Sequence, residues 1–99
     1  MICMAREEYI EKLKKYKRDN SKAYGIVNIG IFGSVARGEE KEESDVDVCV
    51  EMSKPDLFYM VHIKEDLQEL FGRSVDVVRM RPSMNALLRK NIERDMIYA

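Results

Sequence analysis

Apolar side chains recur at helical spacing in three segments of the chain. In the first, from about Arg6 to Lys22, the apolar positions stand four and three residues apart within a strongly charged background: Tyr9, Leu13 and Tyr16. This spacing predicts an amphipathic helix that buries one face. Gly25 is placed to end it, because glycine readily adopts the left-handed backbone that closes many helices.

Two further helices are expected in the second half of the chain. One is predicted to begin after the turn Lys54-Pro55-Asp56 and to end at Gly72. Its apolar stripe consists of Leu57, Met60, Val61, Leu67, Leu70 and Phe71. The other is predicted after Pro82, where the apolar positions are Met84, Leu87, Leu88 and Ile92.

Between these helices lie three segments with the composition of strands. Residues 26–32 are rich in β-branched side chains on both faces, which is typical of a buried strand. In residues 45–50 the valines alternate with Asp45, Asp47 and Cys49, so these three are predicted to share one face. Residues 74–79 form the third strand, with Asp76 in the middle, and residues 96–98 suggest a short edge strand.

The predicted order alternates helices with a few strands along one chain of 99 residues. This order predicts an α/β or α+β two-layer fold, a small mixed sheet covered by helices on one side. We expect residues 1–99 to form a single domain, since this length cannot fill two hydrophobic cores.

Composition and charge limit the classes of partner and the compartment that we expect for this protein. Lys and Arg number 17 against 18 Asp and Glu, giving a net charge of −1, so long nucleic acids are not expected as partners. We find neither an apolar run long enough to span a membrane nor an export signal. The two cysteines, Cys3 and Cys49, lack the spacing of a metal knuckle or a disulfide framework, which predicts reduced thiols and a cytoplasmic protein.

A glycine-containing turn follows the first predicted strand. The sequence from Gly33 to Gly38 reads Gly-Ser-Val-Ala-Arg-Gly and is expected to open a short helix whose backbone N–H groups could face a phosphate. Glu39 and Glu40 stand where a P-loop requires Lys and Ser or Thr, which excludes that class of NTPase. The alternative is a strand-to-helix turn that needs glycine for its backbone alone.

Three aspartates on predicted strands form the second candidate feature. Asp45 and Asp47 lie on one strand face and Asp76 on another strand, although aspartate is depleted in strands and costly beside a core. Three carboxylates on adjacent strands could hold two Mg²⁺ ions, which polarise a phosphoryl centre and activate an attacking hydroxyl. The alternative is that they are exposed charges paired with Arg37, Arg79 or Arg81.

Together these motifs resemble the nucleotidyltransferase superfamily typified by DNA polymerase β, and most closely its minimal nucleotidyltransferase (MNT) proteins. The resemblance rests on Gly33-Ser34-x-Ala36-Arg37-Gly38, then Ser44-Asp45-x-Asp47 after five residues, then Asp76 within Val75–Val78, and it covers essentially the whole chain. It implies transfer of a nucleoside monophosphate from an NTP. Gly33 and Ser34 would bind the triphosphate, and Asp45, Asp47 and Asp76 would ligate two Mg²⁺ ions, with Asp76 also the base. Arg37 would contact phosphate or pair with a carboxylate of the acidic segment that follows it.

The resemblance also implies a partner. MNT proteins are commonly antitoxins of small helical HEPT toxins, which predicts a hetero-oligomer and transfer of AMP from ATP to a tyrosine of the toxin. Two alternatives stay open: a non-catalytic antitoxin that inhibits by occlusion, and nucleotidyl transfer to a small molecule.

Overall fold

The computed structural model describes residues 5–39, 45–54, 56–81 and 83–99, arranged as four helices and four strands in the described ranges. In chain order these are α1 (Arg6–Tyr24), β1 (Ile26–Phe32), α2 (Gly33–Arg37), β2 (Val46–Met52), α3 (Leu57–Phe71), β3 (Val75–Arg79), α4 (Ala86–Asp95) and β4 (Ile97–Tyr98). Cys3, Ser44, Pro55 and Pro82, which the sequence predictions used, lie outside the described residues. None of the helices in the described ranges combines the length and hydropathy needed to cross a bilayer.

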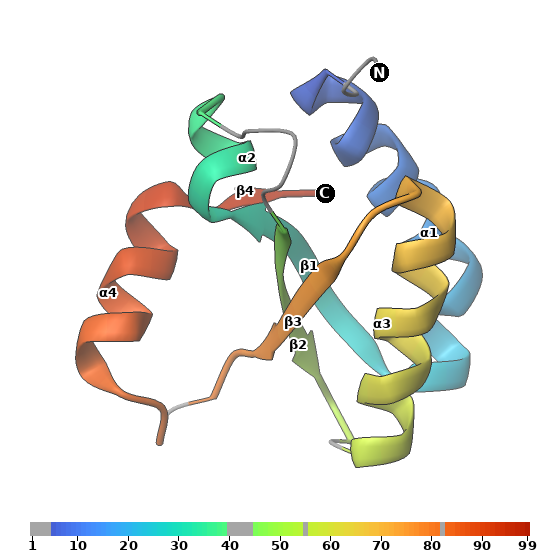
Figure 1. Cartoon of the computed structure of the whole chain (residues 1–99). Coiled ribbons are helices and arrows are strands. Elements are labelled where there is room, and N and C mark those ends of the chain that lie inside the picture. Colours follow the sequence, from blue (N-terminus) through green and yellow to red (C-terminus); the bar gives the residue numbers. More distant parts are fainter. Residues whose placement is uncertain (1–4, 40–44, 55, 82) are drawn as a thin grey trace.

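The strands form one mixed sheet in the order β3-β2-β1-β4 (Figure 1). β1 is antiparallel to both β2 and β4, whereas β2 and β3 are parallel and are joined by the crossover helix α3. The mixed sheet with helices confirms the predicted fold class.

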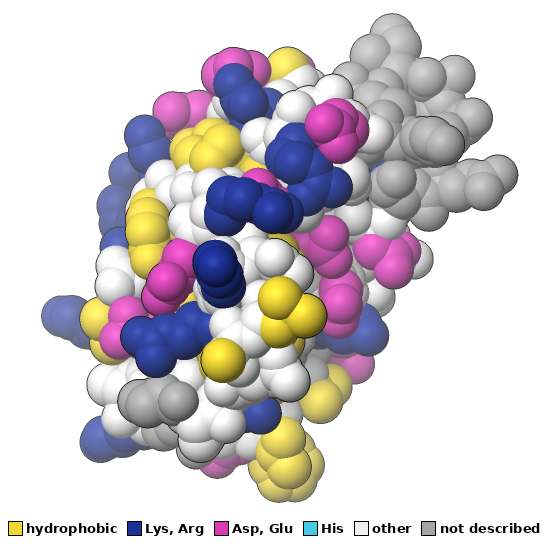
Figure 2. Space-filling model, turned by 90° about the vertical axis from the view of Figure 1, so that its left-hand side faces the viewer, with side chains coloured by type: hydrophobic (Ala, Val, Ile, Leu, Met, Phe, Trp, Pro, Cys, Tyr) yellow, Lys and Arg dark blue, Asp and Glu magenta, His cyan; other side chains and the backbone are white. Residues whose placement is uncertain are grey.

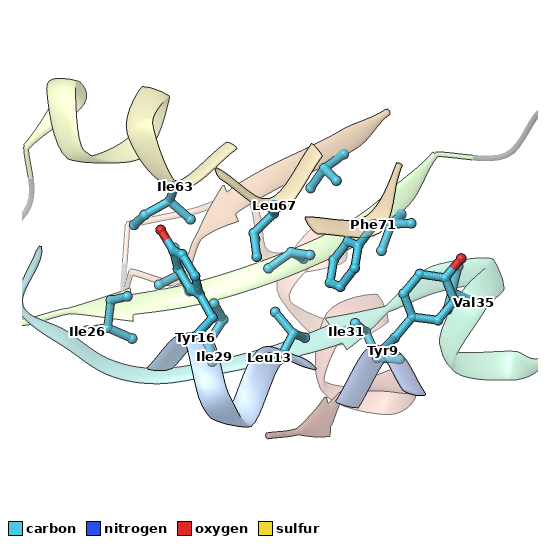
Figure 3. Packing of buried hydrophobic residues seen from close by; sticks show 14 of the residues in the cluster. Tyr9, Leu13, Tyr16, Ile26, Ile29, Ile31, Val35, Ile63, Leu67 and Phe71 are labelled. Atoms are coloured by element: carbon cyan, nitrogen blue, oxygen red, sulfur yellow. The ribbon is translucent and has the colours of Figure 1, made fainter. Parts of the chain in front are cut away.

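The main hydrophobic core lies between one face of the sheet and the pair α1 and α3 (Figure 3). Tyr9, Leu13 and Tyr16 of α1, the positions that the helical spacing singled out, are all buried. From α3 the buried side chains are Ile63, Leu67 and Phe71, and the sheet contributes residues such as Ile29, Ile31, Val46, Val48 and Val50. Each fully buried aliphatic side chain contributes about 1.5–3 kcal/mol to stability.

Helix α4 lies on the opposite face of the sheet. The prediction that helices cover the sheet on one side is therefore wrong. Here Ile92 of α4 and Met84 pack with Cys49 of β2 in a second, smaller cluster. Cys49 is a free, buried thiol on the face that period-two alternation assigned to it and Asp47. This second face also carries Asp47 and Asp76, two of the three predicted catalytic aspartates.

The ends of the elements follow the local signals in the sequence. Gly25 and Gly72 close α1 and α3 in left-handed conformations, as predicted. Asp56 caps α3 by accepting a hydrogen bond from the Phe58 N–H at 2.7 Å. One prediction is wrong by a residue: β2 begins at Val46, so Asp45 precedes the strand and does not belong to it.

Candidate active site

The parallel pairing of β2 with β3 brings two of the predicted aspartates together. Asp47 stands directly opposite Asp76 in the register, and on its other side Asp47 is paired with Phe32 at the end of β1. Neighbours in register on adjacent strands point to the same face of a sheet. The two carboxylates, which are 29 positions apart in the sequence, are therefore neighbours on the face that α4 partly covers.

The environment of Asp47 disfavours its charged form. The side chain is half-buried, and this burial is the largest cause of its raised pKa; the negative charges of Asp76 and then Asp45 raise the pKa further. Arg37 opposes the shift. A bound divalent cation would compensate the like charges that raise the pKa of Asp47.

These carboxylates fit a magnesium site by their chemistry and placement. Mg²⁺ prefers oxygen ligands, usually one or two carboxylates with water and substrate phosphate completing the octahedron. Asp47 and Asp76 are adjacent in register, and Asp45 lies just before β2, exposed and near enough to influence the pKa of Asp47. Across the described residues, no three His, Cys, Asp or Glu side chains already converge on one point that would hold a metal ion. Asp45 is the carboxylate whose placement departs from prediction.

The structural alternative for the aspartates, pairing with Arg37, Arg79 or Arg81, is not what the structure shows. Within the described part of the chain, none of the three aspartates forms an ion pair with any of these arginines. Among the described residues, no cationic side chain contacts any of the three aspartates directly.

The glycine turn meets the aspartates directly. Gly33 begins α2 immediately after β1, with a positive φ of 71°, and a Cβ atom at this position would overlap the Oδ2 of Asp47. Glycine is thus required by backbone angle and by the approach of Asp47. Ser34 follows in the first turn of α2 and is half-buried. The structure places the predicted phosphate-binding turn against the predicted metal ligand; phosphate binding itself stays a prediction.

Arg37 is engaged by carboxylates. Its Nη1 donates to Asp95 Oδ2 at 2.7 Å, and its Nε donates to Glu39 Oε2 at 3.0 Å. Glu39 opens the acidic segment, so the proposed pairing of Arg37 with a carboxylate of that segment is present. A role of Arg37 toward phosphate stays a prediction.

Sequence reasoning missed two residues that hold α2 in place. Asp95 ends α4 and is 58 positions from Arg37, and Arg6 of α1 donates from Nη1 to the Ala36 carbonyl oxygen at 3.0 Å. A helix of five residues is too short to be stable alone and needs such contacts. No local signal marks either residue, because each is an ordinary charged residue in an amphipathic helix.

Comparison with known proteins agrees with this arrangement. The sequence profile of the nucleotidyltransferase domain family matches residues 10–99. The chain belongs to this family. This nucleotidyltransferase is 35% identical over 99 residues to the protein adenylyltransferase MntA of Thermococcus cleftensis, covering 99% of both chains.

Solved structures share the fold. A chain provisionally named a minimal nucleotidyltransferase aligns with a TM-score of 0.76 and 32% identity, over 95% of both chains. A chain from a crystal structure of a toxin-antitoxin with AMP-PNP aligns with a TM-score of 0.74 and 25% identity, over 89% of this nucleotidyltransferase and 69% of that chain. Family membership shows that the protein is an enzyme of the nucleotidyltransferase class.

Proposed function

We propose that this nucleotidyltransferase transfers AMP from ATP to a hydroxyl group of a partner toxin, a tyrosine of a HEPT-like protein, and so acts as its antitoxin. The observation that carries the proposal is the placement of Asp47 beside Asp76 and against the Gly33 turn. A glycine turn whose N–H groups could bind phosphate, beside paired carboxylates that could hold Mg²⁺, supports nucleotidyl transfer.

The roles of the residues follow from their positions. Asp45, Asp47 and Asp76 would hold two Mg²⁺ ions, which supply charge neutralisation at the α-phosphate and lower the pKa of the attacking hydroxyl. The N–H groups at the first turn of α2, from Gly33 and Ser34, would bind the triphosphate. Asp76, which is exposed, would accept the proton of the acceptor hydroxyl as its oxygen bonds to the α-phosphorus and pyrophosphate leaves.

The nature of the donor and acceptor is supported by relatives. The Thermococcus cleftensis relative is named a protein adenylyltransferase, which favours ATP as donor and a protein as acceptor. The structural neighbour that holds AMP-PNP is a toxin-antitoxin assembly, which favours a toxin as the partner and a hetero-oligomer as the working form.

The test uses ATP labelled on the α-phosphate, Mg²⁺ and the protein encoded by the adjacent gene, which the proposal expects to be a HEPT-like toxin. We expect the toxin to become labelled, and Asp47→Asn to lower the labelling rate to about one hundredth or less, the scale seen when one charge-stabilising group is lost from an active site. Asp19→Asn is the matched control, because Asp19 is an exposed aspartate of α1 whose one described ion pair is with its neighbour Arg18.

The outcomes separate transfer from occlusion. Undiminished labelling by Asp47→Asn would refute the assigned mechanism. If Asp47→Asn labels nothing yet still protects cells from the toxin as well as the wild type does, inhibition proceeds by occlusion. Labelling of a small-molecule acceptor such as an aminoglycoside, with the toxin unlabelled, would point to a different acceptor.

A further inference from the structure

Arg37 lies between two groups of carboxylates. On one side are Asp95 and Glu39, which accept its hydrogen bonds. On the other side is the active-site group, because α2 packs against β2 and its first residue, Gly33, lies directly against Asp47, one helical turn before Arg37. The guanidinium is thus a cation with carboxylates on two sides, and it is paired with those of Asp95 and Glu39.

An arginine that turned toward the active site would compete with a metal ion. Arg–carboxylate pairs are strong, charge-assisted and frequently bidentate, and they use the same oxygen atoms that ligate Mg²⁺. Such a pair would neutralise the charge that attracts the cation. Carboxylates that hold a metal ion beside an unrestrained arginine would therefore lose metal affinity.

The position of Asp95 allows it to keep Arg37 away from the active-site carboxylates. Its side chain is only 9% exposed, whereas Arg37 is 39% exposed, so the carboxylate is the fixed member of the pair. It ends α4, which Ile92 anchors to the sheet with a fully buried side chain. Arg94 also pairs with Asp95 at 3.2 Å and helps to keep it ionised. Figure 2, which faces α4, shows Lys and Arg side chains interspersed with Asp and Glu on this surface.

We propose that Asp95 is a positioning residue that holds Arg37 away from Asp45, Asp47 and Asp76, so that these carboxylates stay available to divalent cations. The inference rests on the proposed function, in which the three aspartates hold the metal ions. It gives α4 a role in the site although no residue of α4 is a proposed ligand.

The test measures binding of Mn²⁺ alone, without nucleotide, by electron paramagnetic resonance titration of the whole chain. The variants are Asp95→Asn, Arg37→Gln and the double variant, with circular dichroism to confirm that each is folded. We expect Asp95→Asn to weaken Mn²⁺ binding by about tenfold, the lower end of effects seen for residues that support metal ligands indirectly. In the Arg37→Gln background, the same change should have little effect, because the competing cation is absent.

Two controls separate this role from simpler ones. Glu93→Gln removes a negative charge from the same helix, at an exposed residue that pairs with Arg89, and should leave Mn²⁺ binding near the wild-type value. Asp95→Glu keeps the carboxylate and should retain most of the affinity. If Asp95→Asn does not fold, the proposal is tested by the Mn²⁺ affinity of Asp95→Glu and by nuclear magnetic resonance of the wild type. The chemical shift of the Arg37 Nε–H signal in the wild type should not change when Mg²⁺ is added.

Several results would overturn the proposal. An equal loss of affinity with and without Arg37 would show that Asp95 acts only through its charge, and an unchanged affinity in Asp95→Asn would show that it does not act at all. A large Mg²⁺-induced shift of the Arg37 signal in the wild type would show that Arg37 is not held away. If the wild-type protein binds no Mn²⁺, the proposed metal site is wrong and the proposed function fails with it. If the wild type binds Mn²⁺ and the variants bind it equally well, only the role of Asp95 is wrong and the proposed function stands.

Discussion

At the scale of single residues, Gly33 and Gly38 share a backbone conformation but differ in their surroundings. Both have a φ of 71°; Gly33 is the first residue of α2 and Gly38 is its C-cap. A Cβ atom at Gly33 would overlap Asp47, whereas a Cβ atom at Gly38 would have no heavy atom within 4 Å. The pair therefore separates the cost of an unfavourable backbone angle from the cost of displacing an active-site carboxylate.

This contrast predicts unequal effects of two identical substitutions. Gly38→Ala should lower the free energy of unfolding by about 1–2 kcal/mol, the cost of an L-residue in the left-handed region. Gly33→Ala should cost about 1–3 kcal/mol more, since Asp47 must move from its packed position. Urea denaturation of both variants measures the difference. Equal losses would show that Asp47 does not press against Gly33.

Residue types and their spacing were enough to predict Gly33, Asp47 and Asp76 as candidates, and the register of the sheet places them together. The alternation of side chains assigns faces within one strand, which is why Asp45 and Asp47 were predicted to share a face. That Asp76 lies beside Asp47 depends on the register of β2 with β3, which alternation does not specify. The pairing of Arg37 with Asp95 could not be predicted in this way. It joins residues 58 positions apart on two helices, and nothing in either local sequence specifies how those helices meet.

At the scale of elements, α1 and α3 are joined by a polar contact within their apolar interface. The Tyr16 hydroxyl donates to Asp66 Oδ2 at 2.7 Å, although the tyrosine is only 8% exposed. Burial, and then the hydrogen bond and charge of Asp66, raise the pKa of Tyr16 well above its ordinary value. The folded protein thus keeps this phenol protonated at pH values where the unfolded chain ionises.

The sign of the resulting pH dependence follows from proton binding. Above about pH 10, the usual tyrosine pKa, the unfolded state has lost the Tyr16 proton and the folded state has not, so stability falls as pH rises. We expect Tyr16→Phe to be about 1–2 kcal/mol less stable than the wild type at pH 7, where a hydrogen bond is lost. That deficit should shrink between roughly pH 9 and pH 11, the range around the usual tyrosine pKa in which the unfolded wild type loses its Tyr16 proton.

Denaturation curves at several pH values measure this convergence. Tyr98→Phe is the control, because Tyr98 is 58% exposed and should show no such convergence with the wild type. A constant difference between wild type and Tyr16→Phe across the alkaline range would contradict a shift at Tyr16.

Local signals predicted the limits of α1 and α3, and β1 also has its predicted bounds, whereas α4 begins after Met84, which was predicted as part of that helix. Gly25, Gly72 and the Asp56 cap are local signals that end or begin a helix wherever it packs. A strand ends where its partner ends, and that is a property of two segments. Asp45 alternates correctly with Asp47 but precedes β2, because the described pairing of β2 with β3 begins at Val46 and Val75.

At the scale of the whole molecule, one thin sheet separates two hydrophobic clusters of unequal size. β2 contributes Val46, Val48 and Val50 to the larger cluster and Cys49 to the smaller. Helical spacing identified Ile92 of α4 as an apolar position but could not say that it packs on the other face, since spacing defines a stripe and not its partner. Leu87 and Leu88 of the same predicted stripe are exposed. The strand shared by both clusters should make the domain unfold as one unit.

Ile92→Ala tests this cooperativity from the side of the active site. Ile92 is fully buried in the smaller cluster, so the substitution should lower the free energy of unfolding by about 2–5 kcal/mol. Tyr9 and Tyr16 belong to the larger cluster, with Tyr24 and Tyr59 packed against it, so tyrosine fluorescence reports mainly on the opposite face of the sheet. We expect the urea midpoint to fall equally by tyrosine fluorescence and by far-ultraviolet circular dichroism.

Leu87→Ala is the control, because Leu87 is 69% exposed on the same helix; this change should alter stability by no more than about 0.5 kcal/mol. A fluorescence midpoint that stayed at the wild-type value while the dichroism midpoint fell would show that α4 unfolds independently of the main core.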